Sequence, residues 1–342
     1  MKVASATGML RTSWVSLLSF LGIAAVAACL DSDPEVAARD LAISPPPPSA
    51  CPSTGTGAIT VTGGSCVVFT PAMAGASASG VNAAVDQYAL APTSGATGRL
   101  VLFLPPSLGT PAHAIATPAS NLYTAGLAAG DHVLSIAYRN NQVIGVICNG
   151  NDACFLGTRM ALVTGAPQPN AAATINATIQ ATEGIYARAA LALAYLAAVQ
   201  PAAGWSQYLT PGVDPVVDPA GAVQWSRVLV VGHSQGGGHA ALLAKLHGVA
   251  RLVTLASPCD EVGGVPASWL SSGSWQTLAW RRWGFAAPVD STCSAYGAIW
   301  TALGYAAVHR FTDAAPCADT SAHTSPLQCA ANMPRVQALL TP

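Results

Sequence analysis

Charged side chains are scarce in this sequence. Asp, Glu, Lys and Arg together make up 8% of its 342 residues, against about a quarter in an average soluble domain. Lys2 and Lys245 are its only lysines, and the formal net charge is −1. A protein that binds nucleic acid needs a dense cluster of Lys and Arg to neutralise phosphates. The charge content therefore argues against a nucleic-acid-binding function.

Long apolar runs are also missing beyond the N-terminus, although 51% of the residues are hydrophobic and the mean hydropathy is +0.43. A membrane-spanning helix needs about 20 consecutive apolar residues. Alanine, spread along the whole chain, raises the hydropathy instead. Several Val, Leu and Ile runs are long enough to bury a core, which argues against disorder.

The common metal-binding spacings are absent as well. The sequence contains neither a CxxC pair nor an HExxH motif, and its seven histidines are scattered. We therefore expect no structural or catalytic zinc site. No residue pattern implies an organic cofactor either.

The N-terminus has the pattern of an export signal. Lys2 and Arg11 precede an uncharged apolar stretch over 14–28, which predicts a secretory signal peptide over 1–28. The stretch is short for a single membrane anchor. It ends in VAAC, which looks like a bacterial lipobox with Cys29 as the lipidated residue; plain cleavage is the alternative.

A Pro-rich linker is predicted after the signal, over residues 29–50, where DSDPE is followed by SPPPPS. Such a segment is a semi-extended spacer. Residues 51–342 are expected to form one soluble domain. We expect the protein to be exported as a cell-envelope lipoprotein, facing the periplasm or the cell surface, with the lipid at Cys29 as its only membrane anchor, and otherwise to be secreted.

If Cys29 is lipidated, eight cysteines remain, and an even number in an exported chain favours disulfides. Their connectivity stays open, because eight cysteines can pair in many ways. Pairing of sequence neighbours gives Cys51–Cys66, Cys148–Cys154, Cys259–Cys293 and Cys317–Cys329. Cys293–Cys317 is the competing pairing.

Short apolar runs alternate with helical stretches along the domain. The expected strands are 58–61 and 66–69, joined as a hairpin around 62–65, then 99–104, 132–138, 227–233, 251–257, 277–285 and 307–313. One long Ala/Leu-rich helix is predicted over 173–200, ended by Pro201. This alternation predicts an α/β fold with a doubly wound, mainly parallel sheet and helices on both faces.

One short motif points to catalysis. Residues 232–236 read Gly-His-Ser-Gln-Gly and fit G-x-S-x-G. A buried strand is predicted directly before the motif and an Ala/Leu-rich helix directly after it, which is the setting that a nucleophilic serine needs. Gly232 and Gly236 would allow the tight turn to close. The alternative is an ordinary Gly-rich turn between a strand and a helix.

From about residue 99 to the C-terminus, the sequence resembles the α/β-hydrolase superfamily of serine hydrolases. More narrowly, GWSQYL (204–209), the stretch from QWSRVLVVGHSQGGG to GVARLV (224–253) and WGF…D (283–290) are similar to a group of exported bacterial hydrolases. Most members of that group have no assigned substrate. The resemblance implies the α/β-hydrolase fold, a Ser–acid–His triad in that chain order, and an oxyanion hole built from two backbone N–H groups.

Ser234 is the predicted nucleophile, and the general base must be a histidine that follows it. His239 and His247 lie on the helix after Ser234 and should point away from its hydroxyl, while His309 lies within the last strand pattern. His323 lies in a Ser/Thr-rich loop after that strand, where the family places its base. We therefore predict His323 as the base and expect His233 to shape the turn.

Three aspartates are candidates for the acid that orients the imidazole. Asp290 follows the strand pattern 277–285 after a short loop, where the family places its acid, and is the first choice. Asp260 follows the preceding strand, and Asp313 ends the last one. The candidates that are not the acid would be cap or turn residues.

The oxyanion hole is expected to use the backbone N–H of Gln235, which follows the nucleophile. The second donor should come from the loop after 99–104. This loop reads Leu-Pro-Pro-Ser-Leu-Gly and departs from the family pattern, and Pro106 has no N–H to donate. Ser107 or Leu108 must then supply the donor, and Ser107 is the first choice.

Together these features predict an exported serine hydrolase that cleaves carboxylic esters, either small molecules or polymers, through an acyl-enzyme. A serine peptidase or amidase would use the same residues. A surface lipoprotein that keeps the fold without catalysis is the alternative from another class, and the Pro105-Pro106 loop is the feature that favours it.

Overall fold

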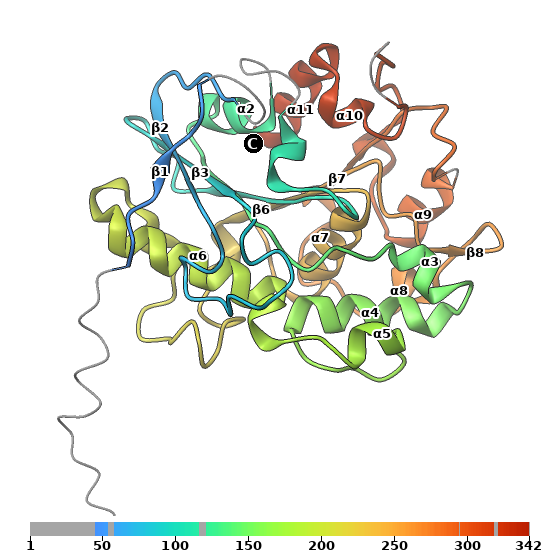
Figure 1. Cartoon of the computed structure of the whole chain (residues 1–342). Coiled ribbons are helices and arrows are strands. Elements are labelled where there is room, and N and C mark those ends of the chain that lie inside the picture. The colour runs from blue at the N-terminus through green and yellow to red at the C-terminus, as the bar shows by residue number, and fades with distance from the viewer. Residues whose placement is uncertain (1–44, 54–57, 116–120, 294, 318–320, 342) are drawn as a thin grey trace, which may run out of the picture. The chain divides into compact units, whose positions relative to one another are not determined.

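The structure is a computed structural model that describes residues 45–53, 58–115, 121–293, 295–317 and 321–341. These residues form a nine-stranded sheet in the order β1-β2-β3-β5-β4-β6-β7-β10-β11 (Figure 1). Its strands are β1 (Ser49–Ala50), β2 (Gly64–Phe69), β3 (Gln87–Pro92), β4 (Leu100–Leu104), β5 (His132–Ser135), β6 (Val228–His233), β7 (Arg251–Leu255), β10 (Arg282–Phe285) and β11 (Arg310–Phe311). A separate hairpin pairs β8 (Glu261–Val262) with β9 (Val265–Pro266).

The sheet is mainly parallel. Strands β5, β4, β6, β7, β10 and β11 run in one direction, whereas β1, β2 and β3 join as antiparallel neighbours at one edge. The predicted α/β class with a mainly parallel sheet is confirmed at this level. Parallel strands need crossover connections, which the helices between them supply.

The α-helices are α2 (Leu122–Ala128), α3 (Ile144–Cys148), α4 (Asp152–Thr164), α5 (Ala173–Asn176), α6 (Ile185–Val199), α7 (Gln235–Leu246), α8 (Ser268–Ser271), α9 (Tyr296–Ala302), α10 (Ser325–Gln328) and α11 (Met333–Leu340). Short 3-10 turns join them: η1 (Pro111–Ala114), η2 (Ala181–Glu183), η3 (Pro201–Ala203), η4 (Trp205–Tyr208), η5 (Trp225–Arg227), η6 (Ala279–Arg281), η7 (Ala307–His309) and η8 (Ala330–Asn332).

Helices cover both faces of the sheet, because the central strands are apolar on both sides. In β4, Leu100, Leu102 and Leu104 belong to the hydrophobic cluster that includes α4, α6 and α7. Val101 and Phe103 alternate with them and belong to the cluster of α2 and α11 on the opposite face. Figure 1 shows α2 beside α11 on one side of the sheet and α4 and α6 on the other.

The predicted hairpin over 58–69 is wrong. Residues 58–61 form no strand, and β2 instead pairs with β1 and β3. Ala58 and Ile59 are buried without sheet pairing. Ile59 and Val61 pack against the hydrophobic cluster on the α2 and α11 face instead. The antiparallel partner that follows β2 in the chain is β3, in which Gln87 pairs with Phe69 and Pro92 pairs with Gly64.

The predicted helix over 173–200 is divided. It forms α5, then the turn η2, then α6, which begins after Gly184 and ends at Val199 just before Pro201. A Cβ at Gly184 would lie 2.4 Å from the backbone nitrogen of Gly165, so the chain approaches another segment too closely there for a larger residue. The buried Glu183 also leaves the helix pattern to form an ion pair with Arg139.

The last strands are shorter than predicted. The pattern 277–285 forms η6 and then β10, and the pattern 307–313 forms η7 and then β11. His309 accordingly lies in η7 rather than in a strand. The parallel pairing of β10 with β11 covers only Gly284–Arg310 and Phe285–Phe311.

The cysteines pair as sequence neighbours. Cys51–Cys66, Cys148–Cys154, Cys259–Cys293 and Cys317–Cys329 lie at disulfide distance, with Cα atoms 5.2 to 5.7 Å apart. The competing Cys293–Cys317 pairing is not formed. Four such pairs fit an oxidising, exported environment.

The predicted signal peptide (1–28), the lipidation site Cys29 and most of the linker 29–50 lie outside the described residues. Within the part that is described, no helix is both long enough and apolar enough to cross a membrane.

The site-bearing edge of the sheet is the one where the parallel strands end. The chain crosses from β4 to β5 through α2 on one face, and from β6 to β7 through α7 on the other. The neighbouring strands β4 and β6 therefore send their following segments to opposite faces. Ligands of open α/β sheets bind at such a switch point, beyond the carboxyl ends of the strands.

Candidate active site

Ser234 occupies a sharp turn between β6 and α7. Its backbone has φ +52° and ψ −121°, a conformation that a non-glycine residue seldom adopts. It is the N-cap residue of α7, and its side chain makes no cap hydrogen bond. The side chain is partly exposed while its neighbours are buried. The turn thus holds a strained serine at the positive end of a helix.

The glycines of the motif are required by close backbone contacts. A Cβ at Gly232 would lie 2.3 Å from the carbonyl oxygen of Gly236, and one at Gly236 would lie 2.1 Å from that of Leu104. Neither position has room for a larger residue. The second contact also brings α7 against the end of β4.

The side chain of Gln235 joins two loops next to Ser234. Its Oε1 accepts a hydrogen bond from Ser107 Oγ at 2.7 Å and another from the backbone N–H of Ile144 at 3.1 Å. Ser107 belongs to the loop after β4, and Ile144 begins α3. The structure therefore brings together both residues that were predicted for the oxyanion hole.

Backbone donors are free at this point. The N–H groups of Ser107 and Gln235 make no hydrogen bond to any described residue, as expected for the first residue of a helix in the case of Gln235. Leu108 is different, because its N–H donates to the carbonyl oxygen of Asn140 at 2.8 Å. Of the two candidates for the second donor, Ser107 is thus the one with an unoccupied N–H.

Asp290 and His323 form a direct pair. His323 Nδ1 donates to Asp290 Oδ2 at 2.7 Å, and the side chain of Asp290 is buried. Asp290 also accepts hydrogen bonds from Tyr296 Oη and, at 2.8 Å, from the backbone N–H of Thr292. Burial alone would raise the pKa of the Asp290 carboxyl, but these hydrogen bonds outweigh it and hold the pKa below its ordinary value. The Asp290 carboxyl is therefore ionised at neutral pH.

The imidazole of His323 has a free nitrogen. In the neutral imidazole that donates from Nδ1 to Asp290, the lone pair is on Nε2, and Nε2 has no hydrogen-bond partner among the described residues. No hydrogen bond joins it to Ser234 Oγ. Such contacts are often long before substrate binds. The two residues are linked indirectly, since His233, next to Ser234, donates from Nε2 to the carbonyl oxygen of His323 at 2.8 Å.

The other candidate acids have different partners. Asp260 is buried and accepts hydrogen bonds from Arg159 Nε and Nη2 at 2.6 and 2.5 Å and from Trp269 Nε1 at 2.8 Å. Asp313 is exposed and pairs with Arg335 at the surface. Neither contacts a histidine, so the geometry leaves Asp290 as the candidate acid.

The other candidate bases are also occupied elsewhere. His239 is fully buried in α7 against Tyr138, and His247 contacts Tyr186 Oη and stacks on Trp225. His309 stacks on Trp283, with ring centroids 3.6 Å apart. None of the three contacts Asp290.

Two residues near the site were not found from the sequence. His113, in η1, stacks on His233 with ring centroids 5.0 Å apart. Arg159, in α4, donates from Nη1 to the carbonyl oxygen of Gln235 at 3.0 Å and thereby contacts the first turn of α7. No local pattern in the sequence marks either residue.

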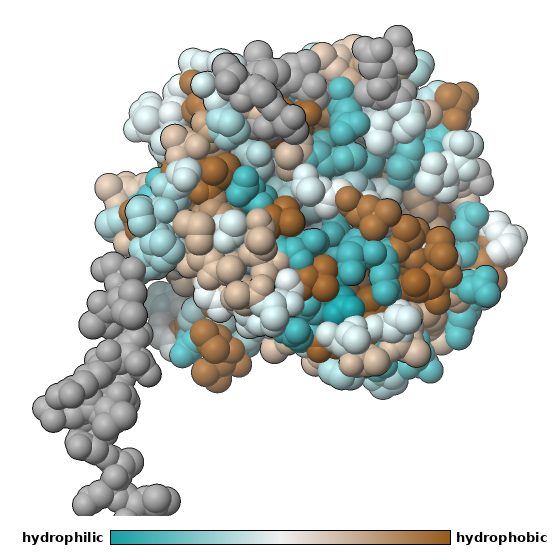
Figure 2. All heavy atoms as spheres, in the orientation of Figure 1, coloured by the Kyte–Doolittle hydropathy of each residue, from teal (hydrophilic) through white to brown (hydrophobic). Residues whose placement is uncertain are grey.

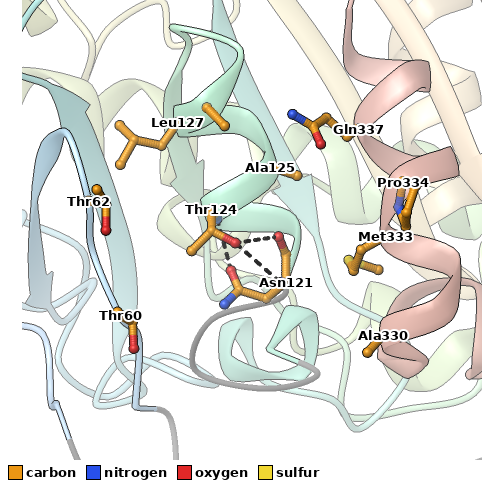
Figure 3. Close-up of a pocket in the computed structure, with 11 residues that line it drawn as sticks. Thr60, Thr62, Asn121, Thr124, Ala125, Leu127, Ala330, Met333, Pro334 and Gln337 are labelled. Carbon is orange, nitrogen blue, oxygen red and sulfur yellow. Dashed lines mark hydrogen bonds between the residues drawn. The ribbon is translucent and has the colours of Figure 1, made fainter.

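One pocket in the described part of the chain lies away from Ser234, Asp290 and His323. A surface pocket of about 520 Å³ lies between α2, α11 and the segment before β2, with Thr60, Asn121, Thr124, Met333 and Gln337 in its lining (Figure 3). None of its lining residues belongs to the triad. Within the described residues, no group of three or more His, Cys, Asp and Glu side chains could hold a metal ion.

Comparison of the chain with family models gives no match, and comparison with curated proteins gives none either. The resemblance to the α/β-hydrolase superfamily therefore remains a prediction from the motifs.

Proposed function

We propose that this protein is a serine hydrolase of carboxylic esters, with Ser234 as nucleophile, His323 as base and Asp290 as the orienting acid. The proposal rests on two features at one edge of the sheet. Ser234 is strained, partly exposed and at the N-terminus of a helix, and the imidazole of His323 donates from Nδ1 to the buried carboxylate of Asp290. Their strands, β6, β10 and β11, are parallel and end at this same edge.

In the first half of the proposed reaction, Ser234 Oγ attacks the acyl carbon of the ester and its proton moves to His323 Nε2. Asp290 stabilises the imidazolium that forms. The carbonyl oxygen becomes an oxyanion, for which the free N–H groups of Gln235 and Ser107 are donors. The imidazolium then gives its proton to the departing alkoxide, and an acyl-enzyme remains.

In the second half, water enters where the alcohol left. His323 Nε2 takes a proton from this water, whose oxygen attacks the acyl carbon of the acyl-enzyme. Collapse of the second oxyanion breaks the bond to Ser234 Oγ, which recovers its proton from the imidazolium. The carboxylic acid is released, and no metal or cofactor takes part in these steps.

The α/β-hydrolase fold is part of the proposal. A mainly parallel sheet with helices on both faces, a nucleophile after a central strand, and an acid and a base after two later strands support it. We also propose export, which the four cysteine pairs support, and anchoring through Cys29, which rests on the VAAC motif alone.

The surroundings of the site favour an uncharged substrate. Leu108, Val146 and Val289 are about 70% exposed, and each lies within a few residues of a group that contacts the triad or Gln235. Their segments, 105–109, 141–147 and 286–292, contain no charged residue except the buried Asp290. Figure 2 shows hydrophobic side chains gathered over α3. Neutral esters with an apolar acyl group suit this setting better than charged ones.

The test is labelling with a fluorophosphonate probe, followed by a panel of p-nitrophenyl esters and matched anilides. Wild type should be labelled and should hydrolyse the esters, whereas Ser234→Ala should do neither while its Tm stays close to that of wild type. Faster hydrolysis of anilides would indicate an amidase instead. Absence of labelling in folded wild type would refute the catalytic proposal and favour a non-catalytic lipoprotein.

A further inference from the structure

His233 makes contacts on both sides of the candidate site. It is the last residue of β6 and only 1% exposed. Its Nε2 lies 2.8 Å from the carbonyl oxygen of His323. Its ring is stacked on that of His113 and lies 5.1 Å, centroid to centroid, from the ring of His323. The ring of His233, the residue before Ser234, thus lies next to two other imidazoles.

The hydrogen bond fixes the state of the His233 ring. A carbonyl oxygen only accepts, so Nε2 must carry the proton. Nδ1 is buried and has no partner among the described residues. Burial lowers the pKa of His233 well below its ordinary value, and the neighbouring His113 and His323 lower it further. The ring is therefore neutral, with its one N–H on Nε2 and its lone pair on the buried Nδ1, so it serves as a donor and not as a second base.

This single hydrogen bond connects two elements that are 90 positions apart in the sequence. The donor, His233, is the residue before Ser234. The acceptor is the backbone carbonyl of His323, the proposed base. The loop of His323 is otherwise held by Asp290, by the Cys317–Cys329 pair and by Gln328, which donates to the carbonyl oxygen of His113 at 3.3 Å. Of these contacts, only the one from His233 reaches the residue beside the nucleophile.

We propose that His233 is a positioning residue, which holds the main chain of His323 in place relative to Ser234 by donating from Nε2 to its carbonyl oxygen. The inference rests on the proposed hydrolase function. Small displacements of a reacting group slow catalysis steeply, by about 100-fold for 1 Å. Loss of this hydrogen bond should therefore reduce the chemical step more than the binding of substrate.

The experiment compares His233→Gln with His233→Asn and His233→Leu. The amide nitrogen of Gln extends about as far as Nε2 of His and can donate to the same carbonyl, whereas that of Asn is shorter. We expect Leu and Asn to lower kcat for a p-nitrophenyl ester, and the rate of fluorophosphonate labelling, by about 10- to 100-fold. KM should change less than about threefold, and Gln should recover most of the lost rate.

His132→Leu is the matched control. His132 is also buried at 2% exposure and its Nε2 also donates to a backbone carbonyl, that of Ala203, at 2.7 Å. It begins β5, so it lies at the opposite end of the sheet from the site. This variant should lower Tm while the folded protein keeps its kcat.

Two outcomes would overturn the inference: unchanged kcat in folded His233→Leu or His233→Asn, or equal losses in Gln and Asn, which would indicate packing rather than the hydrogen bond. If the Leu variant does not fold, the comparison of Gln with Asn decides alone. Failure of the function itself would look different, because wild type would then neither react with the probe nor hydrolyse the ester.

Discussion

Arg159 and Asp260 form a buried ion pair in which two guanidinium nitrogens donate to the two carboxylate oxygens. A third, Nη1, donates to the carbonyl oxygen of Gln235 in the first turn of α7. Gly238 is also part of this contact, since a Cβ there would lie 2.2 Å from Arg159. Asp260 was a candidate acid because of its position in the sequence. In the structure it instead holds Arg159, which contacts the turn that contains Ser234.

The three aspartates should respond differently to neutralisation. Asp290→Asn should lower kcat/KM by about 10³- to 10⁴-fold, because the wrong imidazole tautomer is then favoured. Asp260→Asn leaves Arg159 buried and unpaired and should destabilise the fold by about 3–5 kcal/mol. Asp313→Asn should change neither property. Ester kinetics normalised to the folded fraction, together with urea unfolding, separate the effects; if Asp260→Asn is the worse catalyst after normalisation, the acid is misassigned.

The side chain of Gln235 allows a test of the oxyanion loop. Ser107→Ala removes one neutral hydrogen bond but keeps the backbone N–H, so kcat should fall by less than about tenfold. Gln235→Leu removes the acceptor for both Ser107 Oγ and the buried N–H of Ile144. It should therefore cost more, about 10- to 100-fold. Steady-state ester hydrolysis measures both variants, and a larger loss in Ser107→Ala would contradict the assignment of the backbone N–H as donor.

Sequence patterns predicted the parallel strands where the chain itself is apolar throughout. The runs 99–104, 227–233 and 251–257 became β4, β6 and β7 with little change. Strand β3 was not predicted, because the apolar run within Gln87–Pro92 is short, contains two alanines and has no β-branched residue; it forms a strand through its pairing with β2 and β5. Propensity was overridden by tertiary contacts there.

In the site too, the features set by the local sequence could be predicted, and those set by tertiary contacts could not. The turn around Ser234 could be predicted because the motif and the strand and helix that flank it follow one another directly in the sequence. The pairing of Asp290 with His323 came from the family resemblance, not from spacing. Arg159 and Asp260 are 101 positions apart, and His113 meets His233 only through the fold, so no local pattern could indicate either contact.

The cysteine pair around the base should matter for catalysis as well as for stability. The double variant Cys317→Ser, Cys329→Ser opens a loop of 12 positions that contains His323, and should cost about 3 kcal/mol of stability and lower kcat. The matched control is Cys51→Ser, Cys66→Ser, a pair 15 positions apart that joins β2 to the residue after β1. It should cost similar stability without lowering kcat of the folded protein. Unfolding curves and ester kinetics give both numbers, and unchanged kcat in the first variant would show that the base needs no such clamp.

Acid should destabilise the fold through the half-buried His247. Burial lowers the pKa of His247 to about 4, so the unfolded chain, in which imidazole titrates near about 6.5, binds more protons than the folded one between these two values.

The free energy of unfolding therefore falls as the pH is lowered. The stability that His247 contributes is complete above about pH 6.5 and is lost as the pH falls toward 4. Allowing for its partial exposure, we expect a loss of roughly 1–3 kcal/mol from this residue. His247→Gln cannot take up the proton, and its amide can still meet Tyr186 Oη, the partner of the imidazole at 2.7 Å. Urea unfolding of both proteins at pH 7 and pH 4.5 should show a smaller decline in the variant, and equal declines would mean that His247 is already protonated in the folded protein or titrates normally.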